Sequence, residues 1–151
     1  MGILQVAFFI ILLAVSYQDI KRMEIKDGCH AAIVLLAVAA ILLDKNPGIL
    51  SRLLGVLCVS APMFALTLLI PGAFGGGDIK LVAAAGLFLG WENTVIAAVL
   101  AVFAGGVYAL YLVLIQKADR EQRFPFGPFL CVGMAAAVLW GNEIREFWMN
   151  L

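Results

Sequence analysis

Six long apolar runs, separated by short polar segments, set the strongest limit on how this chain can fold. The runs cover about residues 3–18, 28–43, 49–70, 78–90, 93–116 and 126–140. Hydrophobic residues make up 64% of the chain and charged residues 13%, whereas a soluble domain is about half apolar and about a quarter charged. Because a spanning helix needs about 20 mostly apolar residues, the pattern predicts an all-α polytopic membrane protein. It predicts six transmembrane helices within one membrane-embedded domain, residues 1–151.

The fourth run is short for a membrane-spanning helix. Apolar runs of about 10–14 residues are more often re-entrant or buried than spanning. The run crosses only if Asp78 and Lys80 lie within the membrane boundary, sheltered by protein or water. Pro62 predicts a kink in the third run. The mixed tail, residues 142–151, is expected to lie on the membrane surface.

The distribution of Lys and Arg predicts the orientation, because cytoplasmic loops carry an excess of these residues. With six crossings and the N-terminus outside, seven Lys and Arg residues fall on the inner side and three on the outer side. The inner residues are Lys21, Arg22, Lys26, Lys80, Lys117, Arg120 and Arg123, and the outer ones are Lys45, Arg52 and Arg145. All three tryptophans, Trp91, Trp140 and Trp148, then fall at the outer interface, as in an aromatic belt. We therefore expect a multi-pass protein of the cell (inner) membrane, in contact with lipid, whose Asp19 and Asp78 share the cytoplasmic face. The formal net charge of +0 gives no indication of a nucleic-acid partner.

Two carboxylates are the candidate catalytic groups. Asp19 ends the first apolar run, and Asp78 follows three glycines at the start of the fourth. A charge at such a boundary is costly, and glycines free the backbone to leave helix geometry and allow close approach. Two carboxylates in a half-dry site do not both ionise easily. One then acts as a general base for water and the other as a general acid, which is the chemistry of an aspartic protease without metal or cofactor.

Other polar residues have simpler expected roles. Glu24 and Asp27 compete with Asp19 as the second carboxylate, but are expected to be a solvated loop charge and a helix cap. The single histidine, His30, gives little support for histidine chemistry and is expected to pack at the interface. The charged loop 117–123 is interpreted as a connector that helps to set topology, with a substrate-docking lid as the alternative.

Three segments together resemble a known family. Gly75-Gly76-Gly77-Asp78-Ile79-Lys80-Leu81 resembles the GxGD signature of membrane aspartic proteases, in the form used by type IV prepilin peptidases. Asp19, followed by a basic stretch and Ile25, is similar to their first catalytic segment. Residues 124–129 (Phe-Pro-Phe-Gly-Pro-Phe) look like the Pro-Phe-Gly-Pro segment that opens their last helix. The matches are in family order and cover essentially the whole chain.

The resemblance implies both an activity and a site. Asp19 and Asp78 would be the catalytic pair, and the substrate would be a prepilin-like protein cut on the cytoplasmic side just before its hydrophobic helix. Lys80 is expected to bind a substrate carboxylate or a phospholipid. The residues expected to contact substrate are Gly75, Gly76, Gly77, Lys80, Phe126, Gly127 and Pro128.

The chain also departs from many relatives. It has Ile25-Lys26-Asp27 where they have Ile-Pro-Asn, and it has neither the extra cytoplasmic loop nor the paired cysteines of the long members. It therefore resembles the short, peptidase-only members, such as those of tight-adherence pilus systems and archaeal preflagellin peptidases. N-methyltransferase activity is accordingly not expected.

Three alternatives to a prepilin peptidase stay open at this stage. Buried carboxylates also relay protons or bind cations in small transporters and channels. A non-catalytic membrane subunit of a pilus assembly would tolerate the loss of both carboxylates. A presenilin-like or signal-peptide-peptidase-like enzyme would use the same chemistry, but this chain lacks the Pro-Ala-Leu segment of those relatives.

Overall fold

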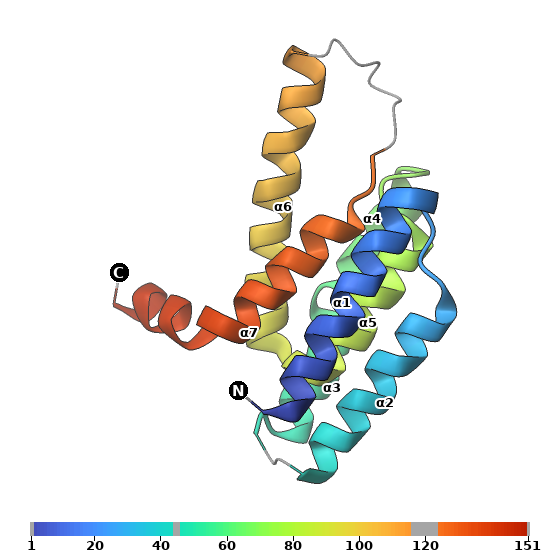
Figure 1. The fold of residues 1–151 in the computed structure, drawn as a ribbon. Coiled ribbons are helices and arrows are strands. Elements are labelled where there is room, and N and C mark those ends of the chain that lie inside the picture. Colours follow the sequence, from blue (N-terminus) through green and yellow to red (C-terminus); the bar gives the residue numbers. More distant parts are fainter. Residues whose placement is uncertain (1, 44–45, 116–123, 151) are drawn as a thin grey trace.

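The computed structural model describes residues 2–43, 46–115 and 124–150, and within these ranges the secondary structure is entirely helical (Figure 1). The prediction of an all-helical chain is therefore confirmed. The loop 117–123, predicted as a connector or lid, lies outside the described residues. The helices are α1 (Ile3–Arg22), α2 (Asp27–Leu43), α3 (Ile49–Cys58), α4 (Ser60–Leu69), α5 (Gly76–Leu89), α6 (Trp91–Leu114) and α7 (Gly127–Met149).

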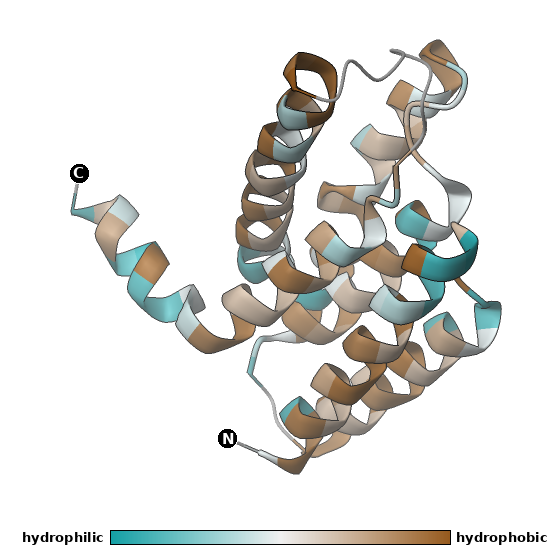
Figure 2. Ribbon diagram, turned by 45° about the horizontal axis from the view of Figure 1, so that its top comes forward, coloured by the Kyte–Doolittle hydropathy of each residue, from teal (hydrophilic) through white to brown (hydrophobic). Residues whose placement is uncertain are grey.

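Four helical segments of the described chain are long and apolar enough to cross a membrane. They are α1, α3 together with α4, α6 and α7, and α2 is a shorter apolar helix. Hydrophobic residues colour most of the helices in Figure 2, and hydrophilic residues gather near the end of α1 and the start of α2. These features support an integral membrane protein. The count of six crossings and the outside N-terminus stay predictions.

The third apolar run breaks earlier than predicted. The sequence places the kink at Pro62, but the helix is interrupted at Val59, between α3 and α4. Pro62 then lies in the first turn of α4, where a missing backbone N–H costs little because that N–H has no partner within the helix. The break one turn before the proline therefore accommodates it without a lost hydrogen bond in a helix interior.

The first and last helices are longer than their apolar runs. Helix α1 continues to Arg22, so Asp19 lies inside the helix rather than after it. Helix α7 continues through the predicted surface tail to Met149. Figure 1 shows its C-terminal part bending away from the bundle.

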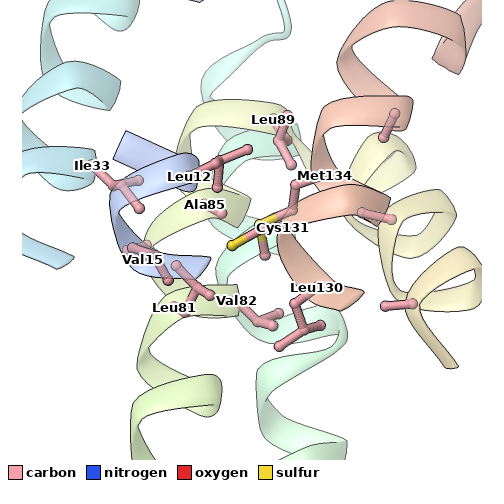
Figure 3. Packing of buried hydrophobic residues seen from close by; sticks show 14 of the residues in the cluster. Leu12, Val15, Ile33, Leu81, Val82, Ala85, Leu89, Leu130, Cys131 and Met134 are labelled. Carbon is pink, nitrogen blue, oxygen red and sulfur yellow. The ribbon is translucent and has the colours of Figure 1, made fainter. Parts of the chain in front are cut away.

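Helix α5, which corresponds to the shortest of the six apolar runs, lies at the centre of the bundle. It packs against α2, α3, α4, α6 and α7, and buries residues on several sides, including Leu81, Val82, Ala85 and Leu89. A helix that is apolar all round is expected to be buried in this way. In Figure 3 the labelled side chains of α5 meet those of α1, α2 and α7, and this cluster forms the core.

Glycines allow the closest helix crossings. A Cβ atom on Gly86 of α5 would overlap the backbone of Gly55 in α3, and a Cβ on Gly55 would overlap the backbone of Gly86. Gly133 of α7 meets the backbone of α6 at Ala97 in the same way. Small residues at such crossings let backbones approach closely, which is how helices associate in lipid, where apolar burial gives little driving force.

Candidate active site

Asp19 is held by the N-terminus of a helix far along the chain. Its side chain is buried in the last turns of α1, and its Oδ2 accepts a hydrogen bond of 2.8 Å from the backbone N–H of Gly127, the first residue of α7. A Cβ atom at Gly127 would lie 2.6 Å from this oxygen. Only glycine therefore allows the contact. The N-terminus of a helix carries a partial positive charge, so α7 provides a favourable end for a carboxylate.

Asp78 lies in the first turn of α5, after the Gly75 N-cap. Its backbone N–H donates to the Gly75 carbonyl at 3.1 Å, and its carboxylate lies close to Gly75, because a Cβ atom there would be 3.2 Å from Oδ2. The side chain is buried, and its Oδ1 has no hydrogen-bond partner among the described residues. A buried carboxylate oxygen without a donor is costly when it is charged.

One pocket contains both carboxylates. It has a volume of about 360 Å³ and is lined by Asp19, Met23, Glu24, Ile25, Asp27, Gly75, Gly76, Gly77, Asp78 and Lys80. The charges of Asp19 and Asp78 are close enough to repel each other. The fold therefore brings Asp19 and Asp78, which are 59 positions apart in the sequence, into one half-buried acidic site.

The other residues predicted to bind substrate divide into two groups. Gly75, Gly76, Gly77 and Lys80 line the pocket. Phe126, Gly127 and Pro128 do not line it, and they form the start of α7 instead. Phe126 is the N-cap of that helix, and its ring packs against Phe74 with 5.8 Å between centroids. This segment meets the pocket through the bond from Gly127 to Asp19.

Lys80 forms an ion pair at the rim of the pocket. Its Nζ lies 2.9 Å from Oδ1 of Asp27, and both side chains are well exposed. The hydrogen bond and the charge of Lys80 hold the pKa of Asp27 below its ordinary value. Asp27 is the first residue of α2, and it also lies near His30. Glu24 is exposed at the same rim.

Two contacts go beyond the sequence prediction, one beside the site and one at the opposite end of α5. His30, predicted to pack at the interface, places Nε2 3.1 Å from the carbonyl oxygen of Gly77. Arg52, counted as an outer surface charge, is only 2% exposed and donates to the carbonyls of Leu87 and Phe88 at the end of α5. No sequence signal marks either contact, because each joins helices whose register is set only by packing. Among the described residues, no three His, Cys, Asp or Glu side chains are grouped to hold a metal ion.

These features define a polytopic helical membrane protein with two buried aspartates in one pocket. A model of the Type IV leader peptidase family matches residues 6–110, and the chain belongs to that family. It is 26% identical over 145 residues to a prepilin leader peptidase/N-methyltransferase of Aeromonas salmonicida, covering 93% of this chain and 50% of the relative. The protein of the same description in Bacillus subtilis is 29% identical over 146 residues, covering 97% of this chain and 59% of the relative.

A third relative matches over a shorter region. The prepilin leader peptidase/N-methyltransferase of Legionella pneumophila is 36% identical over 76 residues, covering 50% of this chain and 26% of the relative. No solved structure matches the chain. The chain spans about half the length of the first two of these curated relatives.

Proposed function

We propose that this chain is an aspartic endopeptidase that removes the leader peptide of prepilin-like proteins at the cytoplasmic face of the cell membrane. Asp19 and Asp78 would be its catalytic residues. The observation that carries the proposal is the shared pocket, in which two buried carboxylates from separate helices face the same space. Family membership supports leader processing, and the relatives named above are prepilin leader peptidases.

The reaction follows from the two carboxylates. In a half-dry site one carboxyl group holds a proton while the other is ionised. The ionised group takes a proton from water as the water attacks the scissile carbonyl, and the protonated group donates to the carbonyl oxygen. The tetrahedral intermediate then collapses: one of its hydroxyl groups gives a proton back to the carboxylate that had protonated the carbonyl, the C–N bond breaks, and the leaving amine takes the proton that the other carboxyl group had accepted from water. The pair is thereby restored. No covalent intermediate with the protein forms.

The residues around the pair support a peptide substrate. Gly75, Gly76 and Gly77 line the pocket without side chains, so an extended peptide backbone has access to Asp78. Lys80 is expected to attract a carboxylate of the substrate or a phospholipid, in exchange with Asp27. The start of α7 contributes by holding Asp19 through Gly127, rather than by contact with the peptide.

The chain is expected to cleave the peptide and not to methylate the new N-terminus. The support is the expected resemblance to the peptidase-only members of the family, together with the acidic groups of the pocket, whereas the relatives named above are described as peptidase/N-methyltransferases. The mature N-terminus produced by this chain is therefore expected to carry no added methyl group. The mass of the first peptide of the product measures this directly.

Co-expression tests the proposal. Candidate prepilins from the same genome, each with a C-terminal tag, are expressed with the wild-type chain, and leader removal is followed as a mobility shift on a gel. Asp19→Asn, Asp78→Asn and the corresponding Glu variants should all abolish the shift, because a protease pair needs both carboxylates in place. Cleavage that survives in any Asn variant would contradict the mechanism. A cation or proton site would instead retain partial function with Glu.

A further inference from the structure

The first turn of α2 contacts the residue next to Asp19. The side-chain oxygen Oε1 of Gln18 accepts a hydrogen bond of 3.3 Å from the backbone N–H of Lys26. The side-chain Nε2 of Gln18 donates to Sγ of Cys29 at 3.4 Å. The start of α2 is therefore bonded to α1 directly beside the first catalytic candidate.

The same turn also contacts the residue next to Asp78. His30 is 7% exposed, and its Nε2 lies 3.1 Å from the carbonyl oxygen of Gly77. Because a carbonyl oxygen only accepts, Nε2 must carry the hydrogen. This carbonyl belongs to the peptide unit that contains the backbone N–H of Asp78. The imidazole thus fixes the peptide plane immediately before the second catalytic candidate.

Two neighbouring contacts hold the same segment. A Cβ atom on Gly77 would lie 3.3 Å from Cβ of Ile25, so Ile25 packs closely against the glycine backbone. The ion pair of Lys80 with Asp27 joins α5 to α2 one turn further on. Three consecutive glycines give residues 75–77 a freedom that a helix start does not otherwise have. The position of this segment therefore depends on contacts from other helices.

We propose that His30 is a positioning residue for the peptidase reaction. By holding the Gly77 carbonyl, it sets where the Asp78 carboxylate lies relative to Asp19. His30 does not line the pocket, so it acts through the backbone and not on the substrate. The other ring nitrogen of His30, Nδ1, has no hydrogen-bond partner among the described residues, although Oδ1 of Asp27 lies 3.5 Å away. The catalytic part of this inference rests on the proposed function.

Two substitutions separate the hydrogen bond from the packing of the side chain. His30→Leu fills a similar space without a donor. His30→Gln places an amide N–H close to the position of Nε2. Leu35→Ala, on the exposed side of the same helix (Leu35 is 70% exposed), serves as the matched control. If His30→Leu does not fold, His30→Asn takes its place, since its amide is too short to reach Gly77.

The first measurement is backbone hydrogen exchange of the peptide that contains residues 75–80, in the purified full chain in lipid nanodiscs. Loss of one buried hydrogen bond in His30→Leu is expected to speed this exchange about fivefold or more. His30→Gln and Leu35→Ala should exchange at the wild-type rate. The second measurement is cleavage of a tagged prepilin from the same genome. A displaced Asp78 should lower kcat about 10- to 100-fold with KM unchanged, and His30→Gln should recover most of it.

The outcomes of the two measurements test different parts of the inference. If His30→Leu leaves both the exchange rate and kcat at wild-type values, the positioning role is wrong. If His30→Gln behaves like His30→Leu, the role of the donated hydrogen bond is wrong. If the wild-type chain cleaves none of the prepilins, the proposed function fails. The exchange rates then still decide whether His30 holds the Asp78 segment.

Discussion

At the residue scale, both candidate catalytic aspartates lie against the N-terminus of a helix. Asp78 belongs to the first turn of α5, and Asp19 accepts the backbone N–H that begins α7. Helix N-termini favour negative charge through their free N–H groups and aligned dipoles. The start of α5 lines the pocket and the start of α7 bonds Asp19 from behind it, and these two helix ends help to explain how the fold holds two acidic groups in a largely apolar bundle.

Gly127→Ala tests the contact between α7 and Asp19. The added Cβ would lie 2.6 Å from Oδ2 of Asp19, so the carboxylate must turn away. Its new position would no longer suit the pair, and we expect the cleavage rate to fall about tenfold or more. The melting temperature should change little, because a short side chain moves more easily than backbone.

Gly106→Ala is the control for this substitution, because a Cβ atom at Gly106 meets nothing within 4 Å. It should leave both the cleavage rate and the melting temperature unchanged. A Gly127→Ala variant with the full wild-type rate would show that the bond to Asp19 has no part in the reaction.

At the element scale, α5 is short but is fixed at both ends. Its N-terminal end is bonded to α2 through Gly77 and Lys80. Its C-terminal end is bonded to Arg52 of α3, whose guanidinium also donates to the carbonyls of Asn46 and Pro47. The last carbonyls of a helix lack partners within the helix. Arg52 donates hydrogen bonds to two of these carbonyls and also joins α5 to the α2–α3 turn.

Arg52→Met should destabilise the protein strongly. The substitution leaves several buried carbonyl oxygens without their charged donor, which we expect to lower the free energy of unfolding by about 3 kcal/mol or more. Thermal unfolding in detergent micelles measures the change. Arg145→Met is the matched control, because the ion pair of Arg145 with Glu92 is partly exposed and should contribute about 1 kcal/mol or less. Equal effects of the two substitutions would contradict the anchoring role of Arg52.

Gly86→Val tests the crossing of α3 and α5. The valine side chain would overlap the backbone of Gly55, and backbone cannot rotate away as a side chain does. The two helices must separate, so we expect a loss of about 3 kcal/mol or more in the free energy of unfolding. Unchanged unfolding in Gly86→Val would show that this close approach does not support the bundle.

The helices were largely predictable from the sequence, whereas their contacts were not. Long apolar runs must form helices in lipid because every backbone group needs a partner, so the runs and the helices coincide closely. The break at Val59 and the extension of α7 to Met149 were missed, since both depend on local geometry that hydropathy does not record. A charged residue such as Arg52 looks like a surface group until the packing of α3 against α5 is known.

The candidate site shows the same division. Asp19 and Asp78 were predicted from the charge that follows three glycines between apolar runs, from the face that both aspartates were expected to share, and from the family resemblance. The bond from Gly127 to Asp19 spans 108 positions, and nothing in the local sequence indicates it. The contact of His30 with Gly77 likewise depends on how α2 packs against α5.

At the scale of the whole molecule, the short central helix accounts for the pocket. At about 1.5 Å per residue, the 14 residues of α5 extend about 21 Å, less than the about 30 Å of a bilayer core. Its N-terminus therefore stops short of the ends of longer neighbours such as α6. The described pocket lies at the end of α5 that carries Asp78, and it is lined by this end together with the end of α1 and the segment that leads to α2.

The predicted orientation is tested at the two ends of α2. Gly28 lies in the first turn of this helix and Gly48 lies in the turn that follows it, and a Cβ atom at either position meets nothing within 4 Å. In a background with Cys29, Cys58 and Cys131 replaced by alanine, Gly48→Cys should react with a membrane-impermeant thiol reagent in intact cells or spheroplasts. Gly28→Cys should react only after the membrane is opened. The reverse pattern would place the aspartates on the outer face and contradict the proposed site of cleavage.

The central claim is that Asp19 and Asp78 act as one catalytic unit. The most direct measurement is the initial rate of leader release from a purified prepilin by the purified wild-type chain, Asp19→Asn, Asp78→Asn and the double variant. Each single substitution should lower the rate by about 10³-fold or more. The double variant should be no slower than the slower single variant, because groups that act together are not additive. A single variant that keeps a rate close to the wild type would contradict the account.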